Sequence, residues 1–232
     1  MNDVFYQSSF YGGVGAPGTA TDVAPVSALW ADRVPLQTQV GRQVRFTDVG
    51  GGSGNVSGGT TMTWNGTRWR PISGVVTLDA IDTANVGVAD TTEQQLNPAH
   101  IAIPAGLIVD GDRIRIVISA SKSGASANCT IRVRFGPAGT VADQLLTTIS
   151  ALSASNQSYN DIFDYKRTGA TAIQQQGNQT YKGASSAAFP APITVANMGT
   201  NAMYMTISAQ MGAATEVPTI QNYTLEWYPT DV

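Results

Sequence analysis

The chain has 232 residues, of which 42% are hydrophobic and 12% are charged, and its formal net charge at pH 7 is −3. The hydrophobic content excludes a disordered chain, the low charge excludes a coiled coil, and the net charge excludes a basic field that would recruit nucleic acid. One cysteine, Cys129, and one histidine, His100, exclude an intrachain disulfide framework and a Cys/His zinc site. We therefore expect no cofactor and no bound metal.

The first 42 residues carry aromatic side chains but show the period of neither a helix nor a strand. Phe5, Tyr6, Phe10 and Tyr11 precede a glycine-rich run, and three prolines break any long helix. Aromatic residues without a local core gain their order from a partner. We predict that residues 1–42 form an extended segment that docks on another protein; the alternative is that they fold back onto their own domain.

Residues 43–74 are rich in turn signals and contain two tryptophans. Asn65-Gly66 between alternating residues predicts a hairpin with a type I′ turn, which would bring Trp64 and Trp69 together across a small ribbon. An isolated ribbon is marginally stable in water, so it needs either its own C-terminal domain or identical ribbons from other chains. We predict a small β-ribbon that serves as a trimerisation module, with Trp64 and Trp69 in the trimer interface.

Residues 75–232 have the pattern of an all-β domain. Ile114, Ile116 and Ile118 alternate with polar residues and share one face of a strand. The predicted strands are 96–103, 112–118, 130–135, 142–149, 157–165, 171–176, 202–210 and 220–228. Glycine, proline, asparagine and serine stand at the breaks. The number and spacing of these strands predict an antiparallel β-sandwich of the jelly-roll type.

Two strands of this domain carry pairs of arginines on the face opposite their apolar residues. Arg113 and Arg115 form one pair, and Arg132 and Arg134 form the other. If the strands are neighbours, four guanidinium groups stand together on one outward face. Such a face is either a solvated or intersubunit surface, or a platform for an anionic glycan, because a guanidinium binds carboxylates in a bidentate manner.

The titratable residues do not form a catalytic pattern. Asp110-Gly111-Asp112 lacks the ligand spacing of an EF-hand loop, and no parallel β-helix repeat typical of glycan-cleaving spikes is visible. His100 has no serine in a nucleophile elbow to act on, and Cys129 is expected to be a small buried residue. We expect that the protein is not an enzyme.

Two segments resemble a known family. The run V-R-F-T-D-V-G at 44–50 and the run W-N-G-T-R-W-R-P at 64–71 resemble a module of bacteriophage fibre and other virion proteins, of the form V-x-F-T-D-V-G, a spacer, and W-[ND]-G-T-x-W-x-P. The run I-P-A-G-L-I-V-D-G-D-R-I-R-I at 103–116 is similar to the strand-turn-strand of jelly-roll tips in such proteins. Nothing comparable matches residues 1–42, where these proteins carry a virion-specific anchor. The resemblance implies a trimeric fibre or spike subunit.

From the resemblance and the pattern of elements we expect a bacteriophage virion structural protein, namely a short homotrimeric tail or head fibre. Its N-terminus would anchor to other virion proteins, and its jelly roll would attach to the host surface. Two alternatives stay open: a capsid decoration or cement protein that binds no receptor, and a carbohydrate-binding module of a bacterial enzyme. The beginning of the sequence lacks signal-peptide features and no segment has the roughly 18 apolar residues of a membrane span, so we expect synthesis in the host cytoplasm and no membrane insertion.

Candidates for contact with a host surface polysaccharide lie in the polar stretch from 157 to 182. Proteins bind sugars through hydrogen bonds and aromatic faces, and a rigid sandwich places loops at its ends for this purpose. The candidates are Tyr159, Tyr165, Lys166, Arg167, Tyr181 and Lys182. A structural role is equally open for each, because tyrosine commonly buries its ring and exposes only its hydroxyl. Trimeric avidity would have to supply most of the affinity.

Overall fold

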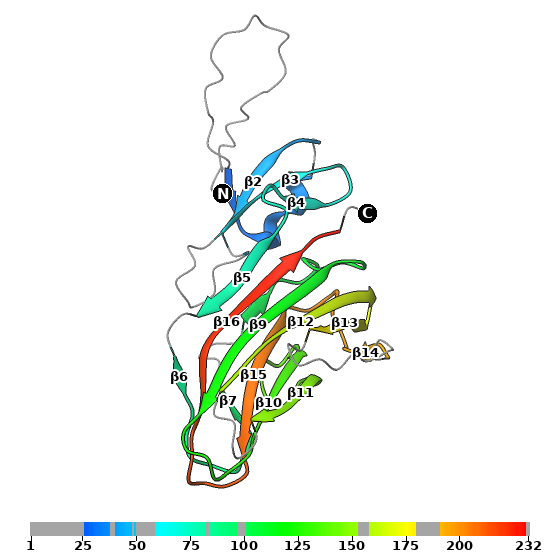
Figure 1. Ribbon diagram of the computed structural model, residues 1–232. Coiled ribbons are helices and arrows are strands. Elements are labelled where there is room, and N and C mark those ends of the chain that lie inside the picture. Colours follow the sequence, from blue (N-terminus) through cyan, green and yellow to red (C-terminus); the bar gives the residue numbers. More distant parts are fainter. Residues whose placement is uncertain are drawn as a thin grey trace, which may run out of the picture.

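The computed structural model describes residues 26–37, 40–47, 49, 59–81, 84–96, 101–152, 158–179 and 191–230. These residues form a small four-stranded sheet and a two-sheet β-sandwich (Figure 1). Outside them lie the predicted anchor residues Phe5, Tyr6, Phe10 and Tyr11, together with His100, Tyr181 and Lys182. Among the described elements, no helix has the length and apolar character required to cross a membrane.

The small sheet contains the first four strands in the order β1-β2-β3-β4. Its elements are β1 (Val26–Ala28), the 3-10 helices η1 (Trp30–Asp32) and η2 (Val34–Leu36), β2 (Gln43–Phe46), β3 (Thr60–Trp64) and β4 (Trp69–Pro71). The short β1 pairs with β2 in parallel, and the other pairs are antiparallel. The sheet therefore begins at Val26, inside the segment that the sequence analysis assigned to the anchor.

The sandwich is formed by the twelve remaining strands. They are β5 (Val76–Ile81), β6 (Asn85–Val86), β7 (Gln94–Gln95), β8 (Ile101–Ile103), β9 (Arg113–Lys122), β10 (Cys129–Gly136), β11 (Gln144–Leu152), β12 (Ser158–Gly169), β13 (Ala172–Gln179), β14 (Ile193–Thr194), β15 (Met203–Met211) and β16 (Pro218–Tyr228). One sheet, here the β9 sheet, has the order β14-β13-β12-β9-β16-β5, with β6 also on β16. The other, the β10 sheet, has the order β11-β10-β15, with β7 and β8 both paired to β15.

The strand order is that of a jelly roll. In the β9 sheet the first long strand, β5, pairs with the last strand, β16, which pairs in turn with β9 and through it with β12. In the β10 sheet β15 lies between β10 and the short strands β7 and β8. All pairs of both sheets are antiparallel. The chain crosses repeatedly between the sheets, since β8 and β10 lie in one sheet and β9, between them in sequence, lies in the other. The predicted all-β fold with an antiparallel jelly-roll sandwich is confirmed.

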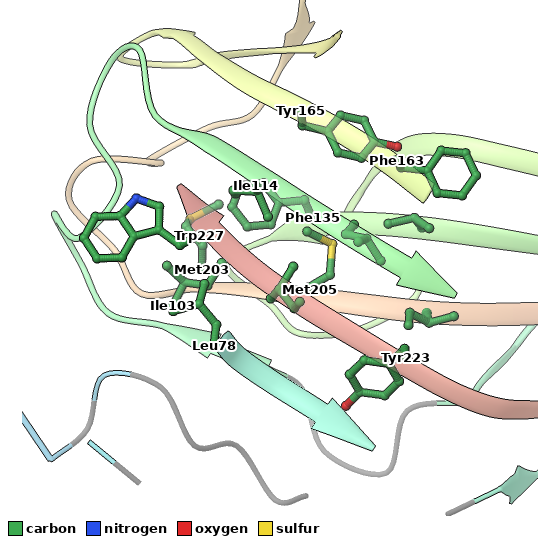
Figure 2. Packing of buried hydrophobic residues seen from close by; sticks show 14 of the residues in the cluster. Leu78, Ile103, Ile114, Phe135, Phe163, Tyr165, Met203, Met205, Tyr223 and Trp227 are labelled. Carbon is green, nitrogen blue, oxygen red and sulfur yellow. The ribbon is translucent and has the colours of Figure 1, made fainter. Parts of the chain in front are cut away.

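The core lies between the two sheets and follows the predicted alternation. Ile114, Ile116 and Ile118 of β9 are each at most 1% exposed, as are Val133 and Phe135 of β10. Figure 2 shows such side chains from both sheets meeting in one cluster. Each fully buried side chain of this size contributes about 1.5–3 kcal/mol through the hydrophobic effect.

Most predicted strands are present, with one revision. Of the predicted strand 96–103, residues 97–100 lie outside the described residues, and residues 101–103 form β8. The preceding strand β7, at residues 94–95, pairs with a different part of β15 than β8 does. Leu96 is buried between them, and its backbone N–H donates to the carbonyl of Ile207. The apolar pattern thus marked the segment that faces β15 but did not predict how its pairing is divided.

Candidate functional site

The paired tryptophans lie in the core of the small sheet. Trp64 and Trp69 are opposite each other in β3 and β4, with ring centroids 5.6 Å apart, and Phe46 meets the ring of Trp69 edge-on at 5.1 Å. Trp64 is 8% exposed and Trp69 is 1% exposed. The predicted approach of the two tryptophans is confirmed. Their side chains are buried within one chain, however, so they do not offer the surface that the predicted trimer interface requires.

The hairpin turn between the tryptophans differs from the predicted type I′ turn. A type I′ turn needs positive φ at both central residues, but only Gly66 has it, at +97°. The loop is instead closed by the N–H of Asn65 donating to the carbonyl of Arg68 at 3.1 Å. The Asn65 Oδ1 accepts hydrogen bonds from the N–H groups of Thr67 (2.9 Å) and Arg68 (2.8 Å). Asparagine therefore serves here as a side-chain cap of a longer loop.

A buried ion pair joins the small sheet to the sandwich. The Arg68 guanidinium donates from Nη1 and Nη2 to the two carboxylate oxygens of Asp112, at 2.9 and 2.7 Å. Asp112 is fully buried and also accepts from Trp227 Nε1 at 3.0 Å and from the N–H of Thr230 at 2.9 Å. Because the remaining oxygen lone pairs of Asp112 are also used, the pair meets the condition under which a buried charge is tolerated.

A second arginine of the same motif holds the chain beyond β16. Arg70 donates from Nη2 to the carbonyl of Thr230, and the Arg68 guanidinium lies 5.9 Å from the centre of the Trp227 ring. Alternation explains the arrangement: Trp69 points into the small core, so its neighbours Arg68 and Arg70 point out of it. This junction was not predicted from the sequence, although the R-W-R pattern indicates that the two arginines share a face.

The four arginines predicted to share a face lie in different sheets. Arg113 and Arg115 belong to β9, whereas Arg132 and Arg134 belong to β10, because the jelly-roll chain crosses to the other sheet between the two strands. The two strands are therefore not neighbours in one sheet, and the four guanidinium groups do not share one outward face.

The two arginines of β10, Arg132 and Arg134, both interact with one carboxylate, that of Glu93. The Arg134 Nε and Nη2 donate to Glu93 at 2.8 and 2.9 Å, and Arg132 Nη1 lies 3.4 Å from Glu93 Oε2. Burial acts to raise the pKa of Glu93, but hydrogen bonds from Arg134 and Ser208 outweigh it and lower the pKa below its ordinary value. Both arginines of this pair are therefore engaged by the charge of Glu93, Arg134 through hydrogen bonds and Arg132 through an ion pair.

The outer face of the β9 sheet carries two transverse rows of polar side chains. One, here called the cationic row, consists of residues in register on four adjacent strands, namely Gln174, Lys166, Arg113 and Tyr228. The next row, here called the carboxylate row, consists of Asp164, Arg115 and Glu226. Figure 1 shows that the four strands, β13, β12, β9 and β16, lie side by side.

Tyr228 connects the two rows. Its hydroxyl donates to Glu226 Oε2 at 2.6 Å and accepts from Arg115 Nη1 at 3.0 Å. The guanidinium carbons of Arg113 and Arg115 lie 5.4 and 4.9 Å from the centre of its ring. Burial and the hydrogen bond to Glu226 raise the pKa of Tyr228, so its hydroxyl stays protonated at neutral pH. The Tyr228 ring is thus held in place and partly exposed, with two guanidinium groups over it.

The structure separates the predicted glycan-binding residues. Tyr165 is 0% exposed and lies in the core (Figure 2), and Arg167 is 8% exposed, donating to the carbonyl of Ile108 and pairing with Asp110 at 2.8 Å. For these two the prediction of a surface role is wrong, because alternation along β12 turns both positions inward. Lys166, between them, lies on the outer face.

Tyr159 is half-buried, and its hydroxyl donates to Asp161. Burial, the hydrogen bond and the charge of Asp161 raise the pKa of Tyr159, so the phenol remains a donor to that carboxylate. Within the described residues, no group of three or more histidine, cysteine, aspartate or glutamate side chains is placed to hold a metal ion.

No protein-family model matches the chain, and no curated protein matches it. Among solved structures it is similar to the CBM2 module of the Lactobacillus casei BL23 phage J-1 evolved Dit, with 10% identity and a TM-score of 0.37 over 68% of this chain and 98% of that one. It is also similar to LamAcat from Zobellia galactanivorans, with 7% identity and a TM-score of 0.27 over 79% of this chain and 76% of that one. At these identities and TM-scores, neither similarity assigns a function.

Proposed function

We propose that the chain is a structural subunit of a bacteriophage virion, a short homotrimeric fibre anchored to other virion proteins by its N-terminal segment. Its jelly roll attaches the particle to a host surface polysaccharide. The observation that carries the proposal is the fibre-type sequence pattern at 44–50 and 64–71. The structure supports its use as a module: Trp64 and Trp69 form a core, Asn65 caps the turn, and Arg68 binds the adjoining sandwich.

Exposed apolar side chains on the small-sheet segment support assembly with other copies. Leu29, Val34, Val40 and Ile72 are 52%, 63%, 67% and 57% exposed. Apolar side chains in such number on a small unit favour burial against a partner, and soluble homo-oligomers use closed symmetry to achieve it. These four residues replace Trp64 and Trp69 as the proposed trimer contacts.

The assembly is tested by light scattering of the full chain. We expect three times the subunit mass, and a species near 24.3 kDa would refute the homotrimer. A variant with Val40→Ser and Ile72→Ser is expected to dissociate without unfolding. The matched control, Val86→Ser with Val88→Ser, changes valines of similar exposure, 60% and 62%, on the sandwich and should remain trimeric.

The role on the particle is tested by locating the chain on virions by electron microscopy and by removing it from them. A fibre that binds a receptor is expected to leave intact shells that no longer infect. A cement protein would instead leave shells that lose stability, and that result would replace the attachment role by a decoration role. Deletion of residues 1–20 should leave a folded protein that no longer enters particles, and normal incorporation would refute the anchoring role.

A further inference from the structure

We infer that the cationic row of the β9 sheet binds an acidic polysaccharide whose sugar rings carry carboxylates. This inference rests on the proposed attachment function and adds to it a site and a class of polymer. It is carried by the arrangement of Lys166, Arg113 and Tyr228 on adjacent strands.

The two cations of the row stand directly opposite each other. Lys166 and Arg113 are register partners of β12 and β9. Like charges in this relation destabilise a sheet, so the pair is unfavourable in the chain by itself. Within the described residues, Lys166 has no ion pair or hydrogen bond through its ammonium group, and Arg113 has only its contact with the Tyr228 ring. An anion above the row would remove the repulsion.

The nearest carboxylates are already engaged in the adjoining row. Asp164 binds Arg115 through both oxygens, at 3.0 and 3.4 Å, and Glu226 accepts the hydrogen bond of Tyr228 at 2.6 Å. Asp164 is 7% exposed, so its charge is turned toward Arg115 and not toward an incoming ligand. The carboxylate row therefore fixes the position of Tyr228. It does not neutralise Lys166 and Arg113, whose charges remain available to an anionic ligand.

The dimensions and chemistry of the row favour a sugar polymer over a single ion. Four strands at a spacing of about 4.8 Å give a row about 14 Å long, which suits a segment of several linked rings. The Arg113 guanidinium binds carboxylates through paired hydrogen bonds, and the Gln174 amide suits hydroxyl groups. The Tyr228 ring supplies an apolar surface for the C–H face of a sugar, which a polymer without rings would not use.

The test measures binding of the full chain to polygalacturonate, to fully methyl-esterified polygalacturonate and to polyphosphate. We expect binding to polygalacturonate that weakens with added salt, and no binding to the uncharged ester. Substitution of Arg113→Gln with Lys166→Gln should weaken binding about a hundredfold, since two charge-assisted contacts are lost. Arg42→Gln with Arg45→Gln removes the same charge from the small sheet and should change the affinity by less than about twofold. Light scattering of each variant checks that its oligomeric state is that of the native chain, so that a difference in affinity does not come from a difference in avidity.

Equal affinity of the native chain for polyphosphate, or no affinity for polygalacturonate, would overturn the class of ligand. An unchanged affinity after Arg113→Gln with Lys166→Gln would overturn the site. Binding to host cells separates these failures from failure of the proposed function. If the native chain and the variant bind the cells equally, attachment stands and the site is wrong. If the native chain does not bind them at all, the attachment role itself fails.

Discussion

The small sheet and the sandwich reach stability by different means. Strands β9 and β12 of the sandwich contain 10 and 12 residues, and their apolar faces bury a core shared by two sheets. Strands β3 and β4 of the small sheet contain 5 and 3 residues. Its core is small, with Trp64 and Trp69 packed beside Val44, Phe46 and Met62, and a buried ion pair links it to the sandwich. The stability of the sandwich thus depends on a large buried apolar area, whereas the stability of the small sheet depends on a few specific contacts.

The largest expected effects come from the buried tryptophans, one in each region. Trp69→Ala and Trp227→Ala should each lower the free energy of unfolding by about 3–5 kcal/mol, because each leaves a cavity. Trp227→Ala should destabilise the sandwich, whereas Trp69→Ala should unfold the small sheet at lower urea and leave the sandwich transition in place. Urea unfolding followed by circular dichroism and hydrogen exchange distinguishes these results. One shared transition, shifted equally by both substitutions, would contradict the comparison.

The next largest effect is expected at the Arg68–Asp112 ion pair, which joins the small sheet to the sandwich. Asp112→Asn keeps the size of the side chain but removes the charge that faces Arg68, and we expect a loss of about 2–3 kcal/mol. The control is Asp110→Asn, which breaks the pair with Arg167 at a carboxyl whose side chain is 61% exposed. Its expected cost is below about 1 kcal/mol because solvent screens the pair. Equal costs in urea unfolding would show that the junction does not depend on the buried charge.

Acidification tests a carboxylate of the sandwich, Glu216. The backbone and hydroxyl of Ser126 and the ammonium of Lys122 hydrogen-bond Glu216 and lower its pKa to about 2. A lowered pKa stabilises the fold above the ordinary value, 4.5, and this stabilisation is lost as pH falls toward 2. We expect the Tm of the native chain to fall over that range. Glu216→Gln should have a lower Tm at pH 6 and a flatter profile, so parallel profiles would contradict this role.

The smallest effect lies in the hairpin turn of the small sheet. Asn65→Ala removes the acceptor for two backbone N–H groups and should cost about 1 kcal/mol, as loss of a comparable cap does. Asn65→Asp retains the acceptor oxygens and should cost less. Hydrogen exchange at Thr67 and Arg68 reports the change directly. If both variants exchange like the native chain, the side chain does not hold the turn.

The sandwich was predictable from the sequence because its faces alternate. The positions of Ile114, Ile116 and Ile118 predicted the buried face of β9 correctly. Most of the long strands were predicted at the right places, but the short strands β6 and β14 were not predicted. The partners of each strand were not predictable, because jelly-roll neighbours are distant in sequence. Arg113 and Arg132 belong to consecutive strands, β9 and β10, yet these strands lie in different sheets.

The candidate site was predictable only in part, for a related reason. Lys166 was selected correctly as an outward residue, but Tyr165 and Arg167 were selected with it. Both residues have polar groups, but the alternation of β12 turns their side chains inward. Tyr228 was missed because its role depends on β16 lying beside β9, a pairing that only the fold reveals.

The central position of β16 has a consequence for how the protein is made. This strand is the last of the sandwich in sequence, yet it lies between β9 and β5. On the ribosome, the β9 sheet therefore cannot close until residues 218–228 have emerged, and the unpaired edges of β5 and β9 stay exposed in the meantime. The Asp112 carboxylate likewise lacks two of its hydrogen-bond donors until Trp227 and Thr230 have been synthesised. Because the sheet depends on pairing between strands that are distant in sequence, we expect this sandwich to fold slowly and to expose strand edges that chaperones can bind in the meantime.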